Sequence, residues 1–364
     1  MSLGLPQLRR YAVARSLFPP TTLEAAFERL AFVQADPIRA PARAQDLILR
    51  PRVKGYRAGD LERRYADVGV HEDVFVNYGF VTDRLHALMH PRSNFSRWSP
   101  TRRARAQAVL DFVRERGVVH PREVDAHFAH GAVTNYWGGS SNATTQLLDD
   151  MHYRGLLRVV RRSAGVRTYA SYEHAVQNVD AAGRRERLDA LVDVVVRLYA
   201  PLPSTTLLHL VRRLRYAAPQ WRRELTAAIA RARDRLAHAR VDGTVWCWPR
   251  VENAERAVVK HAVRLLAPFD PVVWDRRRFD LFWNWTYRFE AYTPVAKRKL
   301  GYYALPLLWR DDVIGWGNLT VRNGMLDADI GYCAGAAPTD PIFRRELDAE
   351  LDRMRMFLGL EVSG

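Results

Sequence analysis

Apolar and polar positions follow a helical period over much of residues 99–175, which form the clearest block of the chain. The pattern predicts three helices and then two strands that flank a tight turn. The first helix is opened by Ser99-Pro100-Thr101 and stopped by Gly117, and a short second helix follows Val118-Val119-His120-Pro121. The third helix is capped by Ser140-Ser141-Asn142 and ended by Gly155. The two strands are expected at 156–162 and 166–169, with their turn at 163–165. Three helices followed by a basic β-hairpin is the order of elements in a winged helix.

The same order returns further along the chain. The pattern predicts an amphipathic helix at 184–199, a second helix capped near Ser204 and a third at 220–237. Asp242-Gly243 between β-forming residues then indicates a hairpin turn, so we expect another winged helix.

The N-terminal part fits a looser version of this unit, whose hairpin is not evident. Its helices are expected at 8–17, 22–33 and 41–49. Three similar units in succession indicate a tandem array.

The C-terminal part is aromatic and β-prone from Ala267 onward. Turns are expected at Asp311-Asp312, Gly315-Trp316-Gly317 and Arg322-Asn323-Gly324, and a helix from about Pro341 to Leu358. The predicted fold class is therefore α+β, mainly α, with tandem winged-helix domains and a C-terminal antiparallel β sheet or barrel. The expected domains are residues 1–97, 98–178 and 179–264 for the winged helices, and 265–364 for the β-rich region with a basic hairpin and the C-terminal helix.

Charge narrows the candidate partners. The 364 residues include 56 Lys and Arg against 40 Asp and Glu, a net charge of +16, which favours nucleic acid or an anionic membrane surface over an acidic substrate. Only four of the basic residues are lysines. A GC-rich genome is therefore an alternative explanation for the many arginines.

Several classes of protein are not indicated. No apolar run suits a signal peptide or a membrane span, so we expect a cytoplasmic, nucleoid-associated protein that does not enter a membrane. Cys247 and Cys333 are far apart and belong to no His/Cys cluster, and we find no P-loop or dinucleotide fingerprint. We therefore expect no metal and no cofactor.

Winged helices usually bind DNA, with one helix in a groove and the hairpin on the backbone. They also serve as protein–protein scaffolds, but the positive charge favours DNA. In the hairpin of the unit at 98–178, Arg161, Arg162 and Arg167 are candidates for contacts with phosphates rather than bases.

An amide and a carboxylate lie two residues apart in Gln34-Ala35-Asp36, shortly before Arg39 and Arg43. This pairing, at the expected end of an apolar helix, indicates polar chemistry held against a polyanion. The structural alternative is that Asp36 caps the turn before Pro37 while Gln34 points to solvent. These few residues alone do not decide between the two interpretations.

Longer segments carry a resemblance that covers most of the chain. They are Val33-Gln34-Ala35-Asp36, residues 43–49 (RAQDLIL), 265–276 (LLAPFDPVVWDR), 287–292 (YRFEAY) and 296–306 (AKRKLGYYALP). Together they resemble the AlkZ/YcaQ family of bacterial DNA glycosylases. The resemblance implies tandem winged helices around duplex DNA and excision of N-alkylated purines, including nitrogen-linked interstrand crosslinks.

The resemblance also implies roles for the Gln34-Ala35-Asp36 segment. The family signature is glutamine, an apolar residue and then glutamine or aspartate, so this chain resembles the aspartate-bearing, YcaQ-like branch. Asp36 would stabilise an oxocarbenium-like sugar and direct water to C1′, as carboxylates do in glycoside hydrolysis. Gln34 would hold the water or the sugar through its amide.

One segment departs from the family. At residues 71–80, Glu72 matches a family glutamate, but the tryptophan and the histidine that usually follow are missing. His71 is a candidate substitute, although a lone histidine is more often structural. We keep His71 and Glu72 as possible supporting residues.

A second cluster of basic residues, Lys297-Arg298-Lys299, lies between Tyr292 and Tyr302. We expect Tyr292 and the three basic residues to contact DNA phosphates or a groove. The alternative is a solvated turn. Arg276-Arg277-Arg278 is open to the same two interpretations.

The leading interpretation is a DNA glycosylase that acts as a monomer on double-stranded DNA carrying alkylated purines. It should be monofunctional, because no lysine lies beside Gln34-Ala35-Asp36 to form a Schiff base. The alternatives are a non-catalytic winged-helix DNA-binding protein, either a regulator or an inactive relative, and an RNA-binding protein.

Overall fold

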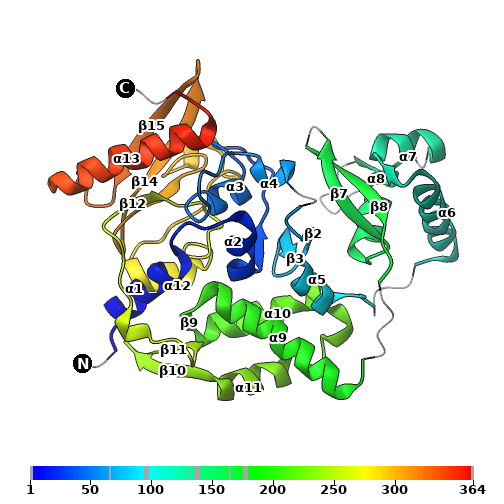
Figure 1. Ribbon diagram of the computed structural model, residues 1–364, viewed down its shortest axis with the longest axis horizontal. Coiled ribbons are helices and arrows are strands. Elements are labelled where there is room, and N and C mark those ends of the chain that lie inside the picture. Colours follow the sequence, from blue (N-terminus) through cyan, green and yellow to red (C-terminus); the bar gives the residue numbers. More distant parts are fainter. Residues whose placement is uncertain are drawn as a thin grey trace. The chain divides into compact units, whose positions relative to one another are not determined.

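Figure 1 shows the computed structural model of the protein, which describes residues 3–64, 67–93, 98–129, 131–134, 140–163, 165–174 and 179–361. The chain divides into two compact units. Unit 1 comprises Met1–Leu61, Val192–Val211 and Ile229–Gly364, and unit 2 comprises Glu62–Leu191 and Arg212–Ala228. Helices and antiparallel strands both contribute, which confirms the expected mixed α and β composition. The winged-helix domains and the four domain boundaries stay predictions.

A four-stranded antiparallel sheet organises the C-terminal part of unit 1. Its strands, in the order in which they pair, are β12 (Val263–Leu265), β13 (Leu305–Trp309), β14 (Asp312–Arg322) and β15 (Met325–Tyr332). Helix α13 (Pro341–Leu358) runs beside β14 and β15 (Figure 1) and packs the ring of Phe343 against Trp309 and Tyr332. The expected antiparallel sheet and C-terminal helix are both confirmed.

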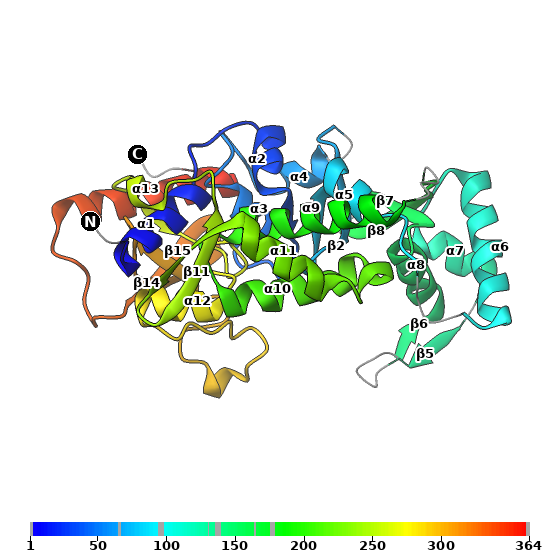
Figure 2. The same cartoon turned by 90° about the horizontal axis from the view of Figure 1, so that it is seen from below.

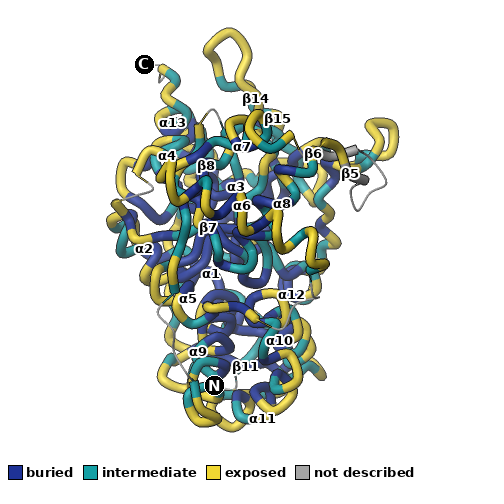
Figure 3. The backbone as a smooth tube through the Cα atoms, turned by 90° about the vertical axis from the view of Figure 1, so that its right-hand side faces the viewer, coloured by how far each residue is buried: buried dark blue, intermediate teal, exposed yellow. Residues whose placement is uncertain are grey.

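The turns of this sheet match the prediction in part. Asn323-Gly324, between β14 and β15, has φ values of 51° and 75°, as a two-residue hairpin turn requires. The tip of this hairpin is exposed in Figure 3. The turn expected at Gly315-Trp316-Gly317 is wrong, because these residues lie inside β14. Glycine is needed there for strand packing, since a Cβ on Gly315 would lie 2.0 Å from the carbonyl oxygen of Gly331.

The aromatic stretch before β13 is not made of strands. Its regular elements are helix α12 (Arg276–Trp283) and one 3-10 turn, η3 (Val295–Lys297). The aromatic side chains fill a core instead, with the Phe279 ring centroid 4.7 Å from that of Trp283 and 5.6 Å from that of Tyr287. Aromatic residues suit both strands and cores, which explains the error. The basic β-hairpin expected at 297–299 is likewise wrong, because this segment is a loop without paired strands.

The N-terminal elements of unit 1 are helices α1 (Leu5–Ser16), α2 (Leu23–Leu30) and α3 (Ala44–Leu49), with strand β1 (Phe32–Gln34) between α2 and α3. Helix α2 ends before the expected residue 33, because Ala31 adopts a left-handed conformation with φ of 59°. The chain therefore enters an extended strand at Phe32. The short helix α4 (Asp60–Arg63) follows at the boundary with unit 2.

The hairpin predicted around Asp242-Gly243 is confirmed. Strands β10 (Leu236–Val241) and β11 (Thr244–Pro249) pair so that Val241 faces Thr244, and β11 also pairs with β9 (Leu202–Pro203). The helices expected before this hairpin are α9 (Ala181–Tyr199), α10 (Ser204–Ala217) and α11 (Leu225–Arg235). Two short 3-10 turns, η1 (Pro219–Trp221) and η2 (Ala254–Arg256), complete this region.

Unit 2 contains the predicted order of three helices and a hairpin. The elements are α6 (Pro100–Arg116), β4 (Val118–Val119), α7 (Pro121–Phe128), α8 (Ala143–Tyr153), β7 (Leu157–Ser163) and β8 (Val166–Ser171). Strand β8 lies between β4 and β7, and a small pair of strands, β5 (Ala132–Thr134) and β6 (Ser140–Asn142), precedes α8. Residue 164, within the expected turn, lies outside the described residues.

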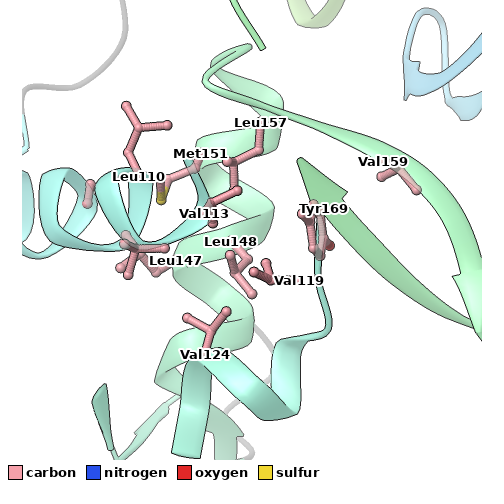
Figure 4. Packing of buried hydrophobic residues seen from close by; sticks show 12 residues of the cluster. Leu110, Val113, Val119, Val124, Leu147, Leu148, Met151, Leu157, Val159 and Tyr169 are labelled. Carbon is pink, nitrogen blue, oxygen red and sulfur yellow. The ribbon is translucent and has the colours of Figure 1, made fainter. Parts of the chain in front are cut away.

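The apolar face of these helices forms one core. In Figure 4 the labelled side chains of α6 and α8 point toward one another and toward the start of the hairpin. Its buried members include Leu110, Val113, Val119, Val124, Leu147, Leu148, Met151, Leu157, Val159 and Tyr169. The helical spacing of these residues is the signal that made the three helices predictable.

Unit 2 also holds a hairpin that the sequence pattern did not reveal. Strand β2 (Val70–Val74) pairs antiparallel with β3 (Tyr78–Thr82), and helix α5 (Asp83–Met89) follows.

Among the described residues of the whole chain, no helix is long and apolar enough to cross a lipid bilayer.

Candidate active site

Gln34 is the last residue of β1, and its side chain is held inside unit 1. Only 8% of the residue is exposed, and its Oε1 accepts a hydrogen bond of 2.8 Å from the indole Nε1 of Trp274. Trp274 in turn lies against the ring of Tyr199, with centroids 5.2 Å apart. The alternative in which Gln34 points to solvent is therefore wrong. A buried amide with a fixed carbonyl has a defined orientation.

Asp36 follows in the loop between β1 and α3 and is partly exposed. Its Oδ1 accepts a 2.9 Å hydrogen bond from the backbone N–H of Ile38, and its own N–H faces Oε1 of Gln45 at 3.5 Å. Asp36 thus stabilises its turn, as the structural alternative expected. Within the part of the chain that the structure describes, its Oδ2 has no hydrogen-bond partner and is available to a ligand or to water.

The surroundings of Asp36 favour its neutral form. Burial raises the pKa of Asp36, and the hydrogen bond from Ile38 only partly opposes this effect. A carboxylate with a raised pKa is a better proton acceptor than an ordinary surface aspartate. The carboxylate is therefore suited to general-base or charge-stabilising chemistry.

The charge of Asp36 affects the pKa of two tyrosines in the loop before β13. Burial and then the Asp36 charge raise the pKa of Tyr303, and the same two causes act on Tyr292. Tyr303 is 3% exposed, and its hydroxyl has no hydrogen-bond partner among the described residues, whereas Tyr292 is 78% exposed. The site thus combines Gln34 and Asp36 with one buried phenol and one exposed aromatic ring.

A buried carboxylate holds the C-terminal side of the basic loop. Glu290, which is 7% exposed, accepts hydrogen bonds of 2.8 Å from the backbone N–H groups of Lys299 and Leu300. The guanidinium of Arg298 lies 5.0 Å from the centroid of the Tyr302 ring, and Lys297 and Lys299 are exposed. In Figure 2 this loop, drawn in gold, projects from the rest of unit 1. A protruding basic loop whose backbone is held by internal hydrogen bonds can contact an anionic surface at low entropic cost.

Two more basic candidates of unit 1 lie in the same loop as Asp36, on its C-terminal side. Arg39 is exposed, and Arg43 is the partly buried residue that immediately precedes α3. Both therefore lie within a few residues of Asp36. Their contact with DNA stays a prediction.

Two of the three arginines predicted to bind DNA in unit 2 have internal partners. Arg162 donates two hydrogen bonds to Glu72, of 2.8 and 2.6 Å, and Arg167 pairs with Asp149 at 2.8 Å. Arg161 is exposed. Arg161 is the most exposed of the three, and the contact of all three with DNA stays a prediction.

The two possible supporting residues also have structural contacts. Glu72 is 1% exposed, and although burial acts in the opposite direction, its hydrogen bonds with Arg162 lower the pKa of Glu72. His71 lies 2.7 Å from Asp83 and stacks on His86 with ring centroids 4.1 Å apart. These contacts hold the β2–β3 hairpin to its neighbours in unit 2.

One group of described residues has the spacing of metal ligands. Asp73, His86 and His90 lie close together and are buried. However, Asp73 already pairs with Arg92 and with His90, each at 2.7 Å. We therefore assign the group a structural role as a buried ion and hydrogen-bond network.

The comparison with protein families decides the class of this protein. A model of the family described as "DNA glycosylase AlkZ-like" matches residues 27–357, which is nearly the whole chain. The chain belongs to the AlkZ-like DNA glycosylase family. DNA is therefore its substrate, and DNA-repair glycosylases are its enzyme class. No solved structure matches the chain significantly.

Three residues around Gln34 and Asp36 were not predicted from the sequence. Trp274 fixes the Gln34 amide, Gln45 lies at the N–H of Asp36, and Tyr303 places a phenol near the Asp36 charge. Each lies in a segment that carried the family resemblance, so those segments were the available signal. Periodicity could not single out Trp274 and Tyr303, because they meet Gln34 and Asp36 only through interactions that are distant in sequence.

Proposed function

We propose that this AlkZ-like protein hydrolyses the N-glycosidic bond of N-alkylated purines in duplex DNA, including those in interstrand crosslinks, and leaves an abasic site. The observation that carries the proposal is the pairing of a fixed Gln34 amide with a partly exposed Asp36 carboxylate in a DNA glycosylase. Within the described residues, one oxygen of that carboxylate remains open.

The chemistry suits these two side chains. Alkylation at N7 of guanine makes the base cationic, so the base leaves with the electron pair of the C1′–N9 bond and becomes neutral. The sugar becomes an oxocarbenium ion, which the negative charge of Asp36 stabilises. Water attacks C1′, and its proton passes to Asp36 and then to solvent. The Gln34 amide, whose carbonyl accepts a hydrogen bond from Trp274, orients the water or the sugar.

A crosslinked base cannot rotate out of the helix, since it remains bonded to the opposite strand. An enzyme that acts on it needs a site that reaches the glycosidic bond while the base stays stacked. Asp36 lies in a loop and is partly exposed, which supports this mode of access. A glycosylase that flips its base would instead enclose it in a pocket.

The nucleophile in this proposal is water, so the enzyme is monofunctional. A lyase step requires an amine that forms a Schiff base with C1′. The four lysines of the chain are Lys54, Lys260, Lys297 and Lys299, and none is adjacent to Asp36 in sequence. We expect no covalent adduct when borohydride is added during turnover.

Base excision from a defined lesion tests the proposal. Duplexes with a single N7-alkylguanine or one nitrogen-mustard crosslink are incubated with wild type, Asp36→Asn and Gln34→Ala, and alkali-labile sites are scored. We expect abasic sites from wild type and a loss of at least about a hundredfold with Asp36→Asn. DNA affinity should be retained, because Asp36→Asn removes a charge that repels phosphates.

A matched control separates chemistry from a general change of charge. Asp327 is an exposed residue of β15 in the same unit, so Asp327→Asn makes the same chemical change away from the site. It should leave excision unchanged. If wild type binds both duplexes and releases no base from either, the protein is a non-catalytic DNA-binding member of the family and the proposal fails.

A further inference from the structure

A cavity of about 440 Å³ in unit 1 is lined by an excess of positive charge. The cationic side chains in its lining are Arg50, Lys54, Arg57, Arg264 and Arg353, and no acidic residue joins them there. The rings of Tyr56 and Phe357 stack beside them with centroids 6.3 Å apart. The volume lies in the range of small-molecule sites, and neither Gln34 nor Asp36 contributes to it.

Three of these guanidinium groups share one buried carboxylate. Glu350 on α13 is 0% exposed, and its Oε1 lies 2.5 Å from Arg50 Nη2. Its Oε2 lies 2.9 Å from Arg353 Nη2 and 3.8 Å from Arg264 Nη1. The backbone N–H of Leu265 also donates to Oε1, at 2.9 Å. Both oxygens of Glu350 are therefore occupied as hydrogen-bond acceptors, and its single negative charge balances one of the three positive charges.

Two of the arginines show the effect of this excess positive charge: Arg264 has a lowered pKa, and Arg50 has a buried donor atom without a partner among the described residues. Burial and the neighbouring Arg353 and Arg50 lower the pKa of Arg264, even though Glu350 attracts its proton. Glu346 adds a weaker attraction but lies 3.9 Å from the exposed Arg345. The Nε of Arg50 is buried and has no hydrogen-bond partner among the described residues. Backbone carbonyls of Val263 and Leu265 accept further hydrogen bonds from these arginines, but Glu350 is the one carboxylate that the three share. Partly buried cations that outnumber their counter-charges are costly, and an anion in the cavity would reduce that cost.

We propose that this cavity binds a phosphate group, with Arg264 and Arg353 as its main donors. Guanidinium groups match phosphate oxygens in shape and charge and form paired, charge-assisted hydrogen bonds. Lys54 and Arg57 are exposed and add positive charge where the phosphate enters. The apolar side of the cavity, formed by Val53, Tyr56, Met356 and Phe357, accommodates the group that carries the phosphate.

The phosphate has two possible sources, a free nucleotide or the DNA backbone, and the chemistry of recognition is the same for both. Calorimetric titration of the full chain with inorganic phosphate and with AMP, at constant ionic strength, tests the first source. A short undamaged duplex tests the second. None of these measurements uses glycosylase activity, so the outcome is independent of the proposed reaction.

Three variants test whether binding takes place in this cavity. Arg353→Gln should weaken binding by at least about tenfold, because it removes a charge-assisted donor. Arg57→Gln alters an exposed side chain for which the described residues provide no hydrogen bond or ion pair, so the variant should fold normally and weaken binding less strongly. Arg345→Gln is the matched control, since this residue is on the same helix α13 but its side chain is 75% exposed and outside the cavity.

Saturable binding of phosphate or AMP that Arg353→Gln and Arg57→Gln reduce, and Arg345→Gln does not, establishes a site for a free phosphate compound. Failure of both small probes, together with a selective loss of duplex affinity in Arg353→Gln and Arg57→Gln, assigns the site to the DNA backbone. The proposal is overturned if no probe binds saturably. Equal behaviour of all three variants overturns it as well.

Discussion

The hydrogen bond from Trp274 to Gln34 provides the sharpest test of the proposed site. In Trp274→Phe the indole N–H is lost, while an aromatic ring still occupies the contact with Tyr199. The Gln34 carbonyl, in a residue that is 8% exposed, then has one fewer donor. Removing the donor of a buried acceptor costs about 1–3 kcal/mol, so we expect the amide to change its orientation.

The cost of that rotation should appear in the chemical step. If the orientation of the amide is needed in the transition state, the same 1–3 kcal/mol corresponds to a loss of roughly 5- to 150-fold in rate. Single-turnover excision of an N7-alkylguanine, with enzyme in excess over duplex, measures this step directly. Affinity for the duplex should stay within about twofold, since Trp274 acts on Gln34 and not on the phosphates.

A second tryptophan supplies the control. Trp283 donates its Nε1–H to the carbonyl oxygen of Asp311 at 2.9 Å, so Trp283→Phe loses the same type of bond in the same unit. It should lower thermal stability without slowing excision. On a Gln34→Ala background, Trp274→Phe should cause no further loss, because the two residues act together. Full activity of Trp274→Phe, or equal losses from both tryptophan variants, would refute a positioning role for Trp274.

Three further outcomes are expected. Because burial raises the pKa of Asp36, excision should fall with decreasing pH at a point above 3.8, and a pH–rate profile without such a limb would contradict the carboxylate mechanism. Burial lowers the pKa of His86 to about 2 and of His90 to about 4, below the unfolded value of 6.5. Stability should therefore be complete above pH 6.5 and decline as the pH falls, by roughly 2 kcal/mol per histidine between pH 7 and pH 5. Urea unfolding measures this decline, which His86→Phe should reduce and the exposed His127→Gln should not. Affinity for undamaged duplex should fall steeply with salt as counterions are released, and Lys299→Gln should make the slope shallower by about one phosphate contact.

Local signals made the helices predictable. Helix α6 begins where Ser99 accepts a hydrogen bond from the N–H of Arg102 and Pro100 takes the first helical position, and it ends at Gly117. Helix α13 has the same type of start, with Asp340 as its cap. Capping residues, proline and glycine act on positions a few residues away, so the local sequence is enough to predict where these helices begin and end.

The geometry of the site depends on causes that lie far apart in the chain. Gln34 is buried because Trp274, 240 positions later, supplies its donor. No local pattern around Gln34 specifies that partner. The motif itself was predictable, but the orientation of its amide and the open oxygen of Asp36 required the tertiary structure.

Net charge is another property whose meaning depends on the tertiary structure. The net charge of +16 led to the prediction of a polyanionic partner, and membership of a DNA glycosylase family agrees with it. Yet several arginines are paired with carboxylates inside the fold. Arg52 forms two hydrogen bonds with the buried Asp270, Arg92 pairs with Asp73, and Arg162 pairs with Glu72.

An arginine in such a pair is neutralised locally, so it adds to the formal count and little to the field at the surface. The charges that can release counterions from DNA are the exposed ones, such as Arg39, Arg161, Lys297 and Lys299. The salt dependence of binding should consequently reflect this smaller set, and the surplus around Glu350, rather than the total of 56 basic residues. Net charge identifies the class of partner, whereas the pairing of each guanidinium determines where that partner binds.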